Sequence, residues 1–65
     1  MNKNELQNDI YYEVMMLLDQ VAMTVKKRLR KKFNNECCND LVEKFNGDYD
    51  SIVEYLSNVY EVYMA

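Results

Sequence analysis

The sequence predicts an all-α protein, in which one long N-terminal helix is followed by two shorter helices that meet at a Gly-Asp corner. Three observations predict this fold class. Proline is absent and glycine occurs once, so almost nothing interrupts helical hydrogen bonding. Apolar residues make up 49% of the chain and recur three and four residues apart, the spacing of one helix face. No repeat, linker or low-complexity stretch divides the 65 residues, so we expect residues 1–65 to form one small domain.

The first helix is expected from about Asn4 to about Phe33, because no residue in that span ends a helix. Acidic Glu5 and Asp9 suit its N-terminal end, where the helix dipole is positive. One broad apolar stripe runs along this helix and is expected to form the core. The stripe contains Ile10, Tyr11, Val14, Leu17, Leu18, Val21, Val25 and Leu29.

The second helix is expected from about Glu36 to Phe45, and either Asn34 or Asn35 is suited to cap its N-terminus. Gly47 follows as the expected left-handed C-cap, because a residue without Cβ adopts a positive φ freely. The glycine therefore ends one helix, and the next helix starts at once.

The third helix has several candidate N-caps, namely Asp48, Asp50 and Ser51, and Ser51 with Glu54 has the spacing of a capping box. Apolar residues cover more than half of its circumference. They are Ile52, Val53, Tyr55, Leu56, Val59, Tyr60, Val62 and Tyr63. This helix therefore offers more apolar surface than a short chain can bury.

The first helix has the same surplus, because Tyr12, Met16 and Met23 lie on a different side from its core stripe. Exposed aromatic and Met side chains are typical of protein interfaces. We therefore expect a helical homo-oligomer at micromolar concentration. The predicted contact residues are Tyr12, Met16, Met23, Val53, Tyr60 and Met64.

Charge is divided between the two parts of the chain. Up to Phe33, seven Lys or Arg stand against four acids, a balance of +3; from Asn34 onward, one Lys stands against seven acids, a balance of −6. Most cations belong to the run KKRLRKK, which we call the basic patch. It consists of Lys26, Lys27, Arg28, Arg30, Lys31 and Lys32. The patch supports an alternative function, the binding of nucleic acid through its phosphates.

The composition argues against several other classes of protein. There is no His, and Cys37 and Cys38 are adjacent, so the ligand spacing of a zinc site is absent and a disulfide between them would close almost no loop. No nucleophile stands beside a base and no Gly-rich phosphate loop is present, so we expect no enzymatic activity, no metal and no cofactor. Reduced thiols, and the lack of a signal peptide or a long apolar segment, predict a cytoplasmic protein, in the host cytoplasm if the source is viral.

The segment CCNDLVEKFNGDYDSIVEYL resembles the last two helices of the ubiquitin-associated (UBA) superfamily, which includes CUE domains and the N-terminal module of bacterial elongation factor Ts. The resemblance covers residues 33–56 only. It implies a helical corner capped by Asp48. Phe33 stands where the family's Met-Gly-Phe loop has Phe, but Lys31 and Lys32 replace Met and Gly, so the apolar ubiquitin-contacting loop is missing. The matching positions are Cys38, Leu41, Val42, Gly47, Asp48, Ile52, Val53 and Leu56.

The overlapping segment VEKFNGDYDSIVEYL also resembles a helix-turn-helix core, with Asn46 where the turn glycine normally stands. The matching apolar positions are Val42, Phe45, Ile52, Tyr55 and Leu56. The second helix of this unit has acids and no Lys or Arg, so it would repel phosphates. This resemblance implies the shape of the corner more than the reading of DNA.

Together these features predict a non-enzymatic protein–protein interaction module, a small self-associating regulator or inhibitor that binds a partner protein. The alternative is a helix-turn-helix-like protein that binds nucleic acid through residues 26–32. The many Asn, Lys and Tyr residues are typical of a bacterial or viral accessory protein.

Overall fold

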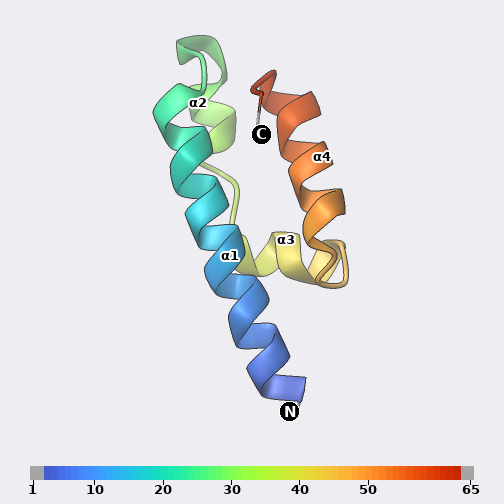
Figure 1. The fold of residues 1–65 in the computed structure, drawn as a ribbon. Coiled ribbons are helices and arrows are strands. Elements are labelled where there is room, and N and C mark those ends of the chain that lie inside the picture. Colours follow the sequence, from blue (N-terminus) through green and yellow to red (C-terminus); the bar gives the residue numbers. More distant parts are fainter. Residues whose placement is uncertain (1–2, 64–65) are drawn as a thin grey trace.

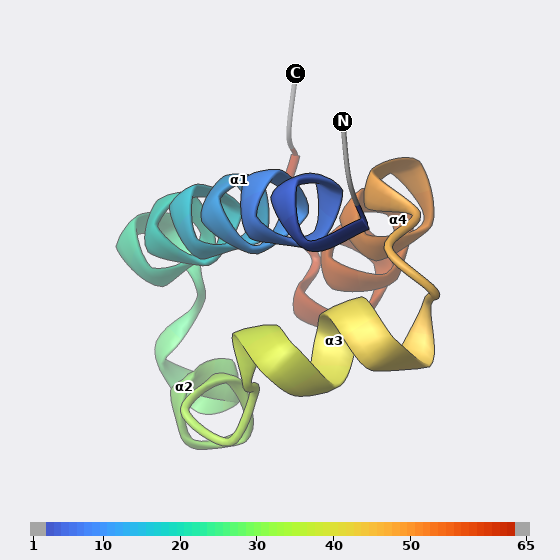
Figure 2. The ribbon, with the colours of Figure 1, turned by 90° about the horizontal axis from the view of Figure 1, so that it is seen from below.

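The computed structural model describes residues 3–63, with side chains from Asp9 onward, and these residues form four α-helices and no strand (Figure 1). The helices are α1 (Lys3–Thr24), α2 (Lys27–Phe33), α3 (Cys38–Lys44) and α4 (Tyr49–Tyr60). α1 and α4 both pack against α3, while α2 folds back beside the end of α1, far from the α3–α4 corner (Figures 1 and 2). The predicted compact all-α class is confirmed.

The predicted continuous first helix is wrong, because α1 ends at Thr24 and a separate α2 begins at Lys27. Between them, Lys26 has an extended backbone with φ −67° and ψ 149°. Thr24 and Val25 are β-branched, which lowers their helix propensity. A straight helix would also carry Phe33 away from the rest of the molecule, whereas the observed bend buries both Val25 and Phe33.

One apolar core fills the space between α1, α3 and α4 and extends to the end of α2. Its buried members are Val14, Leu17, Val21, Val25, Phe33, Leu41, Val42, Ile52, Leu56 and Tyr60. Four of them belong to the stripe predicted for the first helix. The other four stripe residues are partly buried and pack against this core, so the prediction of that stripe is confirmed.

The α3–α4 corner is a Schellman-type helix end. The Gly47 N–H donates to the Val42 carbonyl at 2.8 Å, and the Asn46 N–H donates to the Glu43 carbonyl at 3.2 Å. Asn46 and Gly47 both have positive φ, 54° and 74°. The left-handed position directly after the helix is therefore Asn46, and the expected Gly47 occupies the next one.

The start of α4 is capped by Asp48. Its carboxylate accepts hydrogen bonds from the Ser51 N–H at 3.4 Å and the Ser51 hydroxyl at 2.9 Å. The predicted capping box of Ser51 with Glu54 is therefore wrong. Asp48 occupies the capping position, and Ser51 lies inside the first turn of the helix.

Candidate interaction surfaces

The outer face of α1 is the side that turns away from the core, and it carries Tyr12, Met15, Met16, Asp19 and Met23. Its four apolar side chains are exposed by 67%, 55%, 53% and 84%, in chain order. Three of them were predicted as contact residues. Met15 was missed, although it follows Tyr12 by three residues and therefore lies on the same side of a helix.

The charge on this part of α1 is entirely negative. Between Asp9 and Thr24 the chain has three acids, Asp9, Glu13 and Asp19, and no Lys or Arg. All three acids are exposed. The outer face of α1 is thus an apolar stripe among acidic side chains.

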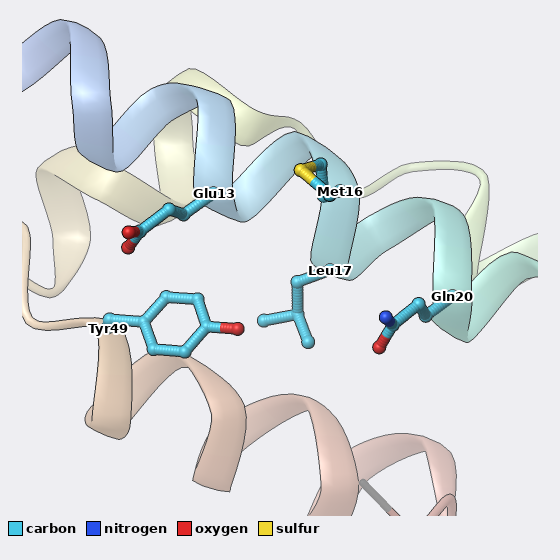
Figure 3. A pocket seen from close by; sticks show the side chains of 5 residues that line it. All are labelled: Glu13, Met16, Leu17, Gln20 and Tyr49. Atoms are coloured by element: carbon cyan, nitrogen blue, oxygen red, sulfur yellow. The ribbon is translucent and has the colours of Figure 1, made fainter. Parts of the chain in front are cut away.

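A shallow, open groove of about 370 Å³ adjoins this face, between α1 and the start of α4 (Figure 3). Tyr49 reaches across from α4 toward Leu17 at the floor, and Glu13 and Gln20 stand at the rim (Figure 3). Met16 belongs to both the groove and the outer face of α1. The two features therefore form one continuous surface.

The contact residues predicted on α4 are placed differently. Tyr60 is completely buried and Val53 is half-buried against the core. The apolar side of α4 therefore packs inside this chain and is not exposed for a partner. Met64 lies outside the described residues. Tyr63, predicted as part of the apolar stripe, is 94% exposed, because the helix ends at Tyr60 and Glu61 adopts a left-handed backbone with φ 55°.

Tyr60 is held by a polar cluster that the sequence did not reveal. Its hydroxyl donates to the Glu36 carboxylate and lies 3.3 Å from the Lys32 carbonyl oxygen, and the Tyr55 hydroxyl donates to Glu36 at 2.8 Å. The Tyr60 ring also packs edge-on against Phe33, with centroids 5.4 Å apart. Burial, and then the hydrogen bond to Glu36, raises the pKa of both tyrosines, because a phenolate would lose water and face a carboxylate.

Three cations of the basic patch are engaged by the fold. Arg28 Nη2 and Lys26 Nζ lie 2.6 Å and 3.8 Å from the Glu61 carboxylate, and Arg30 Nη2 donates to the Ala22 carbonyl at 3.1 Å. The Arg30 contact satisfies a carbonyl left free at the end of α1. The hydrogen bond from Arg28 is the main cause of the lowered pKa of Glu61. These contacts tie the end of α4 to α2, and α2 to α1.

The other three cations, Lys27, Lys31 and Lys32, are exposed and form no ion pair within the part of the chain that the structure describes. Lys27 and Lys31 are four residues apart and share one side of α2. Leu29 and Phe33, also four residues apart, lie on the opposite side and pack into the core. The outward side of α2 is therefore basic and free.

The remaining chemistry of the chain is limited. Cys37 and Cys38 are free thiols; Cys38 Sγ donates to the Tyr11 carbonyl at 3.3 Å, and burial raises its pKa. Among the described residues no group of His, Cys, Asp or Glu could hold a metal ion. In residues 3–63 no helix has both the length and the apolar character needed to cross a bilayer.

No protein-family model, curated protein or solved structure matches this chain.

Proposed function

We propose that this protein is a non-enzymatic protein–protein interaction module that pairs with a second copy of itself through the outer face of α1. One observation carries the proposal: Tyr12, Met15, Met16 and Met23 are each more than half exposed on one side of a helix whose other side is buried. Covering such side chains releases free energy of roughly 25 cal/mol per Å². The predicted regulator or inhibitor role belongs to the same proposal, and a partner protein would compete for this face.

The charges on α1 favour an antiparallel pair. When Tyr12 lies opposite Met23 of the second copy, Met16 lies opposite Asp19 of that copy, because both pairs are centred between Leu17 and Leu18. In this register neither Glu13 nor Asp19 lies directly opposite an acid of the second copy. A parallel pair would instead align each acid with its own copy. From Tyr12 to Met23 the contact would extend over about 16 Å of helix.

The antiparallel register also places the two Asp19 carboxylates close to the symmetry axis. Like charges near each other oppose association, so Asp19 limits the affinity of the pair. The groove beside Met16 provides space for a side chain of the second copy. The position of Asp19 near the axis and of the groove beside Met16 can be probed by substitution, so the antiparallel register can be tested.

The first experiment measures association by sedimentation at micromolar protein concentration. Wild type should form a dimer, and the double variant M16E/M23E should be a monomer with unchanged helicity, because both side chains are exposed in the single chain. The control N39E/N58E adds the same charge at exposed positions of α3 and α4 and should remain a dimer. A monomeric wild type, or a monomeric control, would contradict the proposal.

The second experiment tests the register. Replacement of Asp19 by Asn should tighten the dimer, because it removes two carboxylates from the symmetry axis. A weaker dimer would show that Asp19 faces a cation and would overturn the antiparallel register. It would then favour a basic partner surface on this face.

A further inference from the structure

The basic patch contains two groups of cations with different tasks. Lys26, Arg28 and Arg30 contact Glu61 or the end of α1 and hold α2 in place. The side chains of Lys27, Lys31 and Lys32 are exposed and form no ion pair or hydrogen bond among the described residues. Contacts within the fold account for the first group of cations only. The side chains of the second group are free to contact a ligand outside the chain.

The position of α2 reduces the repulsion that the net negative charge of the chain would exert on a polyanion bound there. The net charge is −3, but the α3–α4 corner with Asp48 and Asp50 lies at the opposite end of α3 from α2 (Figures 1 and 2). Of two acids that contact or lie close to α2, Glu61 pairs with Arg28, and Glu36 keeps its negative charge but accepts hydrogen bonds from Tyr55 and Tyr60. A polyanion can therefore approach the outward side of α2 without meeting a free carboxylate on that helix.

We infer that α2 binds the phosphate backbone of a nucleic-acid duplex through Lys27 and Lys31 on its outward side and Lys32 on its flank. This site is separate from the outer face of α1 and goes beyond the proposed self-association. The apolar residues of α2, Leu29 and Phe33, face the core. The helix therefore has no apolar side chain to insert into a bilayer, as interfacial helices do. It also has no exposed aromatic ring on which single-stranded bases would stack.

Binding of this kind is independent of base sequence and strongly dependent on salt. Three phosphate contacts give a slope of about −2.7 in log affinity against log salt, so the affinity should fall about 40-fold when the salt concentration rises fourfold. Removing two of the lysines should lower the slope by about 2. The slope thus reports how many cations touch phosphate.

The experiment measures fluorescence anisotropy of a labelled DNA duplex of mixed sequence, at low and at fourfold higher salt. The test variant is K27Q/K31Q, and the control is N39D/N58D. Each variant changes the net charge by −2, from −3 to −5, but the control residues lie on α3 and α4. Both pairs are exposed, so helicity should be unchanged and is checked by circular dichroism.

The inference predicts salt-sensitive binding by wild type, at least about a tenfold loss for K27Q/K31Q at low salt, and little change for the control. An equal loss in both variants would show that net charge and not α2 governs binding, and would overturn the site. Failure of wild type to bind duplex at low salt would overturn the inference. Lysine-dependent binding to vesicles containing phosphatidylserine, without duplex binding, would replace nucleic acid by a membrane surface.

Discussion

α1 and α4 both carry apolar side chains on more than one side, but those of α4 are largely buried while those of α1 are buried on one side only. α4 packs against α1 and α3, and its last turn also meets Phe33 of α2, so Ile52, Leu56 and Tyr60 are completely buried. α1 has neighbours on one side only, so Tyr12 and Met23 are mostly exposed. The difference teaches that exposure is set by the number of elements around a helix and not by how much of its circumference is apolar.

The largest effect should come from a pair of substitutions that compares the two helices directly. Leu56→Ala should lower the free energy of unfolding by about 3 kcal/mol, because it leaves a cavity in a completely buried site. Met23→Ala should lower it by less than about 0.5 kcal/mol. Urea unfolding at a low, fixed protein concentration measures both while limiting the contribution of dimerisation. Similar losses of unfolding free energy for the two variants would contradict the claim that Leu56 is buried and Met23 is exposed.

The polar cluster should give the next largest effect. Tyr60→Phe should lower the free energy of unfolding by about 1–2 kcal/mol, because Glu36 loses a donor in a partly buried site. Tyr12→Phe is the matched control, since Tyr12 lies on the exposed side of α1 and should be neutral. If urea unfolding gave the same loss for both, the hydroxyl of Tyr60 would have no role in holding α4.

The same cluster predicts sensitivity to alkaline pH. Burial and Glu36 raise the pKa of Tyr55 and Tyr60 in the folded state above the ordinary value of 10.0. The protonated phenols therefore favour the folded state; this stabilisation is complete below about pH 10 and is lost as the pH rises further. The melting temperature of wild type should fall above that pH, and that of Tyr60→Phe should fall less. A parallel decline in both proteins would place the alkaline transition elsewhere.

A smaller effect is expected at acidic pH, where the end of α4 is attached to α2. The pKa of Glu61 is lowered from 4.5, mainly by the hydrogen bond from Arg28. Its stabilising contribution is present above that value and is lost as the pH falls through the lowered pKa. Glu61→Gln should therefore reduce the loss of melting temperature in acid slightly, because the pair is exposed to solvent. Glu54→Gln, on the exposed side of α4, is the control.

The smallest effect should be the response to ubiquitin. Phe33 and Leu56 stand at positions of the UBA-like pattern, but both are buried in this chain's own core. We therefore expect no change in the amide resonances around them when ubiquitin is added. Shifts confined to these residues would mean that α2 and α4 open to admit a ligand.

Much of the fold could be predicted from local patterns. The spacing of Val14, Leu17, Val21 and Val25 identified the core side of α1, and the lack of proline identified the helical class. The exposure of Tyr12, Met16 and Met23 could be predicted, because a residue opposite a core stripe has no neighbour to cover it. The burial of Tyr60 and Val53 could not be predicted, because the apolar stripe of α4 does not show how many other helices surround it.

The sequence by itself determined the helical class, the core stripe of α1, the positive φ of Gly47 between two helices, and the concentration of cations at residues 26–32. Each depends on residues that are near one another along the chain, so backbone sterics and helical periodicity are sufficient. Only the tertiary structure decided that the first helix bends at Lys26, that Tyr60 is covered, and that Lys27 and Lys31 point away from the ion pairs of Lys26 and Arg28. Those outcomes depend on contacts such as Phe33 with Tyr60 and Arg28 with Glu61, which join residues far apart in the chain.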